Sequence, residues 1–190
     1  VGVNGPIINI MIMLFVGVST GANVCLANFI GARDPEKANL TVHTAITISL
    51  IFGVALAVAG NVLAVPMLKL LNTQEDILEL AALYLRIYFA GMPFIMLYNF
   101  ENAIFRSKGN TRLPLLIMVI AGIINIGLNL FFVAVCGMNV EGVAIATVIS
   151  NAISAVVLLI SLTKDDEYTR FSFRSMKISR SEERRVGKEC

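Results

Sequence analysis

Residues 113–138 read LPLLIMVIAGIINIGLNLFFVAVCGM, from Leu113 to Met138, and contain no charged residue. A helix needs about 20 apolar residues to cross the roughly 30 Å hydrocarbon core of a bilayer, and this stretch is longer than that. It is apolar without interruption, so it lacks the alternation of apolar and polar residues that is typical of strands in membrane barrels. We therefore predict a transmembrane helix.

Four more apolar blocks accompany it. They run from Val1 to Ala32, Leu40 to Leu71, Ile77 to Phe105 and Gly142 to Thr163. The whole chain is 57% hydrophobic and only 15% charged, whereas soluble domains carry about 25% charge. A soluble enzyme, a nucleic-acid-binding protein and a disordered tail are excluded on these grounds, and the net charge of +2 gives no reason to expect a polyanionic partner. The predicted fold class is all-α, a polytopic membrane bundle whose spans cover about 6–32, 40–71, 77–105, 113–138 and 142–163.

The basic residues predict the orientation of the spans. Nine of them follow spans one, three and five: Arg33, Lys37, Arg106, Lys108, Arg112, Lys164, Arg170, Arg174 and Lys177. Lys69 and Arg86 alone lie near the other side, where Glu75, Asp76 and Glu141 are found. By the positive-inside rule the nine are cytoplasmic and Val1 starts outside. A start outside without a signal peptide leads us to expect one more helix before Val1.

The C-terminal part is polar and differs from the rest. We expect residues 166–179 to be a cytoplasmic linker. Residues 180–190 read RSEERRVGKEC and resemble the in-frame translation of a sequencing-adapter oligonucleotide, so we interpret them as an assembly scar and exclude them from the fold.

The third block carries a proline in its middle. Pro93 follows Gly91 between Arg86 and Arg106, which are about 30 Å apart on a helix and can reach opposite interfaces. Because proline has no N–H and its ring displaces the carbonyl of Phe89, a kink is predicted here.

Polar side chains lie on single faces of the last two spans. Asn125 and Asn129 are four residues apart, and Thr147, Asn151 and Ser154 follow the same helical spacing. Two interpretations stay open: hydrogen bonds that hold helices together, or the lining of a wet cavity. Glu101, near Arg106 and Lys108, is expected to form a salt bridge at the inner interface rather than to carry a proton.

Residues for covalent chemistry are lacking. His43 has no Cys or carboxylate at ligand spacing, so no metal site is predicted, and no Ser or Thr has a base beside it. No phosphate-binding GxxxxGK[ST] occurs. We expect no catalytic residue and no enzyme, which leaves a secondary transporter, a channel or a scaffold.

Several motifs resemble one transporter family. They are Gly21-Ala22-Asn23-Val24, Gly31-Ala32-Arg33-Asp34, Val42-His43-Thr44-Ala45, Tyr98-Asn99-Phe100, Arg106 to Pro114 (RSKGNTRLP), Gly122-Ile123-Ile124-Asn125 and Val140 to Thr147 (VEGVAIAT). In this order, over about residues 1–165, they are similar to helices two to six of multidrug and toxic compound extrusion (MATE) transporters.

The resemblance implies a twelve-helix protein of two lobes in the cell membrane, a bacterial inner membrane. It would export drugs or organic cations in exchange for Na⁺ or H⁺, with no other cofactor. Its partners would be those small molecules, the lipid bilayer, and the first helix and second lobe of the same chain. The binding residues by motif position are Asn102, Asn125, Asn129 and Thr147, with Asn102 and Thr147 opposite the other two.

One position departs from the family pattern. Many relatives have Asp where this chain has Asn129, and an amide does not titrate. We therefore predict that this lobe binds through neutral dipoles and that a titrating carboxylate lies outside it. The alternatives are a lipid-linked oligosaccharide or precursor flippase of the same superfamily and a non-transporting membrane scaffold.

Overall fold

The computed structural model describes residues 5–70, 74–165 and 168–171. The helices are α1 (Gly5–Gly31), α2 (Pro35–Leu70), α3 (Glu75–Ala90), α4 (Met92–Ser107), α5 (Arg112–Leu130) with the π-helical turn η2 (Phe131–Val135), and α6 (Val140–Thr163). No strand occurs among the described residues. The predicted all-α membrane bundle is confirmed. The interpretation of residues 180–190 and nearly all of the predicted linker lie outside the described residues.

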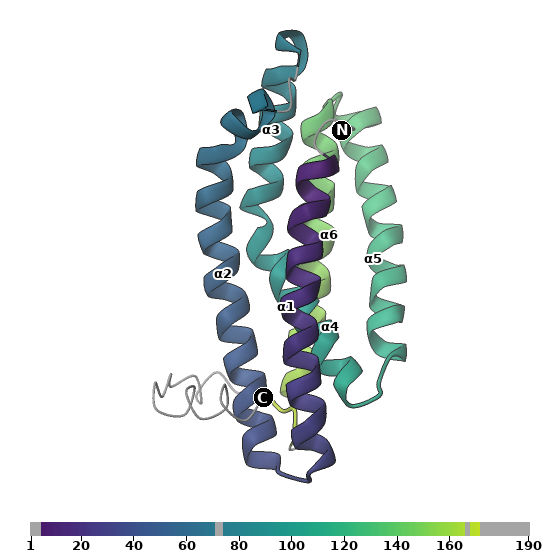
Figure 1. Cartoon of the computed structure of the whole chain (residues 1–190). Coiled ribbons are helices and arrows are strands. Elements are labelled where there is room, and N and C mark those ends of the chain that lie inside the picture. Colours follow the sequence, from purple (N-terminus) through teal and green to yellow (C-terminus); the bar gives the residue numbers. More distant parts are fainter. Residues whose placement is uncertain (1–4, 71–73, 166–167, 172–190) are drawn as a thin grey trace.

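The helices run roughly side by side along one direction (Figure 1). Each lies within five residues of its predicted span. Three helices are long and apolar enough to cross a bilayer, and the bent pair α3 and α4 can form a fourth span. In α1 the described apolar part of this kind is shorter, Val16–Gly31.

The turn between α1 and α2 shows how the sequence ends one helix and starts the next. Arg33 adopts a left-handed backbone conformation with φ of 56°, and the N–H of Asp34 donates to the carbonyl of Phe29 at 3.1 Å, which closes α1. The Asp34 carboxylate then accepts the N–H of Lys37 at 3.1 Å and caps α2. Pro35 occupies the first position of α2, where its missing N–H costs nothing.

The predicted kink in the third span is confirmed. α3 ends and α4 begins at Gly91, and their axes differ by 49°. Two neighbouring helices fit closely around this break. An added Cβ atom at Gly91 would lie 2.4 Å from a methyl group of Val148 on α6, and one at Gly53 on α2 would lie 2.6 Å from Cα of Pro93.

Buried apolar side chains form two clusters along the bundle. One surrounds α3 and the start of α4, with Leu85, Phe89 and Met92 at its centre. The second, which we call the basic-end cluster, joins four helices: Cys25, Leu26 and Phe29 of α1, Ala38, Val42 and Ile46 of α2, Leu97, Ile104 and Phe105 of α4, and Ala155, Leu158 and Leu162 of α6, together with Ile117 and Phe171.

The outer surface is apolar, which is the reverse of a soluble protein. On α5 the side chains of Leu116, Ile123 and Ile126 are each exposed by more than half. Lipid tails can cover such side chains, while the helix satisfies its own backbone groups. The α1–α2 turn, the α4–α5 connection and the end of α6 lie at one end of the bundle (Figure 1). We call this the basic end, because the described members of the nine predicted cytoplasmic Lys and Arg residues gather there.

Candidate substrate and cation site between α5 and α6

A side-chain hydrogen-bond network joins α5 to α6. The Asn125 amide group donates from Nδ2 to Ser150 Oγ at 3.1 Å and, less closely, to Thr147 Oγ1 at 3.5 Å. Asn129, one turn further along α5, donates from Nδ2 to Asn125 Oδ1 at 3.0 Å. The predicted common face of Asn125 and Asn129 is thus present, and Thr147 lies on it.

One acceptor of this network has no partner. Asn129 Oδ1 is buried and makes no hydrogen bond. A buried carbonyl oxygen without a donor costs about 1–3 kcal/mol, so such atoms mark positions where a water molecule or a cation fits. The π-helical turn η2 begins two residues later, and Cys136 N–H donates to the Phe131 carbonyl at 3.1 Å. Such local widening of a helix is frequent at functional sites.

Ser150 is a member of this network that the sequence did not suggest. It lies three residues after Thr147, hence on an adjacent part of the same face, and that spacing could have revealed it. Asn151 and Ser154 were predicted on this face, but each bonds to its own helix: Asn151 Nδ2 donates to the Thr147 carbonyl at 2.8 Å and Ser154 Oγ to the Ser150 carbonyl at 2.9 Å.

Asn102 does not join the network, and the expected arrangement opposite Asn125 and Asn129 is wrong. Asn102 lies about 8 Å from the basic end of α4 at 1.5 Å per residue, whereas Asn125 lies about 20 Å along α5 from the same end. The side chain of Asn102 makes no hydrogen bond with Asn125, Asn129 or Thr147. α4 and α5 scarcely touch, since α6 packs against both.

Glu101 corrects a second expectation. It was expected to pair with Arg106 or Lys108 at the interface. Instead its side chain is fully buried, and neither Oε1 nor Oε2 has a hydrogen-bond partner. Arg106 is exposed, and Lys108 bonds elsewhere. An ionised carboxylate in this setting would be disfavoured by several kcal/mol.

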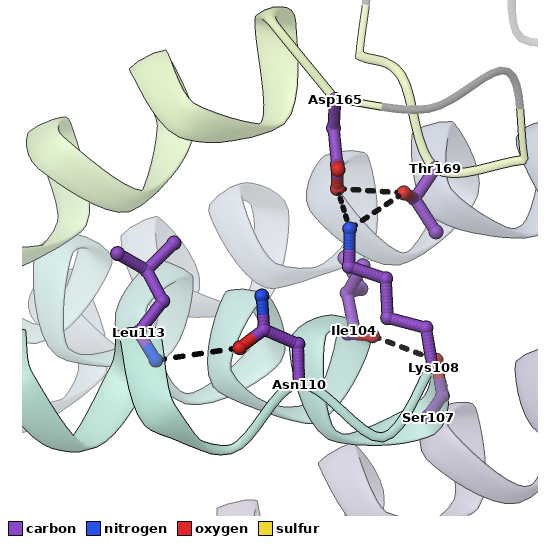
Figure 2. Close-up of polar contacts among 7 residues, drawn as sticks. All are labelled: Ile104, Ser107, Lys108, Asn110, Leu113, Asp165 and Thr169. Atoms are coloured by element: carbon purple, nitrogen blue, oxygen red, sulfur yellow. Dashed lines mark hydrogen bonds and ion pairs between the residues drawn. The ribbon is translucent and has the colours of Figure 1, made fainter.

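Lys108 instead holds the segment that follows α6. Figure 2 shows its ammonium group between the Asp165 carboxylate and the Thr169 hydroxyl. Thr169 Oγ1 also donates to Asp165 Oδ2 at 2.7 Å, and Thr169 is fully buried. Beyond it, Phe171 stacks on the ring of His43, with centroids 5.1 Å apart. The segment after α6 is therefore packed onto the basic end.

Bundle and network together define a multi-pass membrane protein whose buried polar residues lie between apolar helices. The model of the MatE family matches residues 1–131. The chain belongs to this family, that of the MATE transporters, and so to a family of transporters rather than enzymes.

Individual relatives agree with this assignment. The chain is 31% identical over 165 residues to the probable multidrug resistance protein YoeA of Bacillus subtilis, which covers 84% of this chain and 35% of the relative. It is 30% identical over 149 residues to the FAD transporter of Shewanella oneidensis, covering 76% of this chain and 33% of the relative. The chain thus spans about a third of the length of these relatives.

Solved structures show the same arrangement. A MATE crystal structure in the bent conformation has a TM-score of 0.89 and 28% identity, covering 97% of this chain and 42% of that one. A multidrug resistance MATE family transporter matches in its inward-facing conformation with a TM-score of 0.88 and in its outward-facing conformation with 0.87, each at 28% identity and over 98% and 97% of this chain. In the two conformations the share of that chain is 43% and 41%.

Proposed function

We propose that this chain forms the larger part of one lobe of a multidrug exporter that moves organic cations or amphipathic drugs out of a bacterium in exchange for Na⁺ or H⁺. The single observation that carries the proposal is the unpartnered Asn129 oxygen within the Asn125–Thr147–Ser150 network. Helix-stabilising networks satisfy all their members, whereas a binding site keeps an acceptor ready for its ligand.

The chemistry of the network suits a cation. Its members offer amide and hydroxyl oxygens, which are ligands of hard cations and partners of ordered water. None of the three side chains changes charge near neutral pH. The network can therefore attract a cation through neutral dipoles, and Asn102 is a separate candidate contact nearer the basic end.

The likeness to both conformations of one transporter supports a rigid lobe. The match is equally good to the inward-facing and the outward-facing form of that protein. A lobe that keeps its internal packing while it rocks against a second lobe would behave in this way. The tight contacts of Gly53 and Gly91 fit such rigidity.

The FAD transporter among the relatives favours a second candidate. Export of a flavin nucleotide would place an anionic substrate in the same lobe. A lipid-linked oligosaccharide flippase or a non-transporting scaffold remains an outcome of the same test.

The test uses the full-length transporter in proteoliposomes. We expect ethidium efflux that depends on an imposed Na⁺ or pH gradient, and loss of most of that efflux in Asn125→Ala. Ser161→Ala is the matched control, because Ser161 Oγ bonds only to the Val157 carbonyl on its own helix, at 2.9 Å. Efflux of FAD alone would favour the second candidate, and no gradient-dependent movement of either compound would contradict the proposal.

A further inference from the structure

Glu101 is a carboxyl group that the proposed cation site does not use. It lies on α4 with Leu97 four residues before it and Ile104 and Phe105 three and four residues after it. These three side chains are buried members of the basic-end cluster. Since residues three and four apart share a face of a helix, Glu101 faces the interior formed by α1, α2 and α6.

The neighbouring helices offer few groups that could neutralise a negative charge there. α1 carries no Asp, Glu, Lys, Arg or His from Gly5 to Gly31, and its titratable residue in the cluster is Cys25. α6 has Glu141 at its far end as its one charged residue. Neither helix brings a cation to Glu101.

α2 and α4 bring cations only to other partners. His43 of α2 is buried, with Nδ1 2.8 Å from the Asn39 carbonyl oxygen and its ring on Phe171. Lys37 of α2 lies 3.9 Å from Asp34. On α4 itself Arg106 is exposed, and Tyr98 is an uncharged phenol three residues before Glu101.

From this geometry we propose that Glu101 is a proton-binding site of the lobe. A buried carboxyl without a partner is stable only in its neutral form, so in this conformation Glu101 holds a proton. A sodium ion is a poor occupant, because it would need several oxygen ligands and neither Oε atom has a polar neighbour within bonding distance. The proposal rests on the proposed function and narrows its coupling ion to H⁺.

The proton transfer follows from the same surroundings. When the packing around α4 opens to water, the O–H bond of Glu101 breaks, the proton passes to water as hydronium, and the carboxylate becomes hydrated. Reprotonation from water on the other side of the membrane restores the buried neutral form. This role differs from the expected salt bridge, and it places a titrating carboxyl within this lobe rather than only outside it.

Infrared difference spectroscopy tests the proton directly and needs no substrate. In a pH titration of the full-length transporter in lipid, we expect a carbonyl stretch of a protonated carboxylic acid that Glu101→Gln removes. Glu79→Gln is the matched control, because Glu79 is exposed on α3, and it should keep the band. A spectrum of Glu101→Gln identical to that of the unaltered protein would overturn the proposal.

A transport measurement separates coupling from substrate binding. Glu101→Gln should lose ethidium efflux driven by a pH gradient but retain exchange of ethidium across the membrane without a gradient. Retained pH-driven efflux would contradict the proposal. If the unaltered protein moves no ethidium, the proposed function fails, while the infrared band still decides the protonation of Glu101.

A second variant covers the case in which Glu101→Gln does not fold. Glu101→Asp keeps a carboxyl group but shortens its side chain. We expect the carboxylic-acid band to shift in position and the pH dependence of ethidium efflux to shift with it. An unmoved band would assign it to another residue and overturn the proposal.

Discussion

Gly53 of α2 lies so close to Pro93 of α4 that a Cβ atom at position 53 would lie 2.6 Å from the proline Cα atom. This is backbone against backbone, so no side-chain rotation can relieve it. One turn and a half further along α2, Gly60 meets the ring of Phe89 in the same way, at 2.2 Å. α2 therefore carries two notches into which the broken third span fits.

The first prediction concerns this fit. Gly53→Ala should destabilise the protein by about 1–3 kcal/mol, because the added methyl group overpacks a contact that cannot yield. Gly122→Ala on α5 is the control, since nothing lies within 4 Å of a Cβ atom there. Unfolding temperatures in detergent measure both, and equal values for the two variants would show that the notch does not matter.

The second prediction concerns the break itself. Pro93→Ala should insert and fold, because Gly91 and the α2 notches still shape the bend, but it should impair transport more than insertion. The physical reason is that alanine restores an N–H that can bond to the Phe89 carbonyl and straighten the span. Expression level and ethidium efflux, measured on the same membranes, separate the two effects. Lost expression with normal efflux per molecule would be the contrary result.

The third prediction concerns orientation. Residues 33–39, 106–112 and 164–179 should face the cytoplasm, while 72–76 and 137–141 should face out. In a cysteine-free background, Glu75→Cys should react with an impermeant maleimide applied to intact cells. Arg112→Cys, its control at the basic end, should react only after the membrane is permeabilised. The opposite pattern would reverse the orientation.

The fourth prediction concerns the contact at the basic end. The Lys108 and Asp165 side chains are each only 15% exposed, so a double-mutant cycle of Lys108→Gln and Asp165→Asn should give a coupling of about 1 kcal/mol. The cycle of Lys37→Gln with Asp34→Asn is the comparison. That pair is 3.9 Å apart and 42% and 35% exposed, so its coupling should be smaller. Equal couplings would mean that burial adds nothing at Lys108.

Much of the fold could be predicted from the sequence because membrane spans are marked by simple composition. The five apolar blocks placed the helices, and Pro93 announced the bend through its missing N–H. The two glycine notches could not be predicted, since α2 contains several small residues and only its packing against α3 and α4 selects Gly53 and Gly60. Gly17 and Gly21, with a spacing typical of tight helix contacts, meet nothing within 4 Å in the described part of the chain.

The site was predicted in part for the same reason. Helical spacing places Asn125 and Asn129 on one face, since that depends on one helix alone. Asn102 was misplaced because its depth relative to α5 depends on how two helices stand in the membrane. Glu101 was misjudged because charges nearby in sequence are not neighbours when Arg106 points outward and Lys108 reaches Asp165.

The central claim is that the network between α5 and α6 is a wet binding site rather than a set of hydrogen bonds that only holds helices together. The decisive measurement is the pH dependence of ethidium efflux by Asn129→Asp in the reconstituted full-length transporter. The unpartnered Asn129 oxygen should tolerate a carboxylate beside water or a cation, so we predict normal folding and a shifted pH profile. Loss of membrane insertion or expression in Asn129→Asp would show that the site is dry and would contradict the claim.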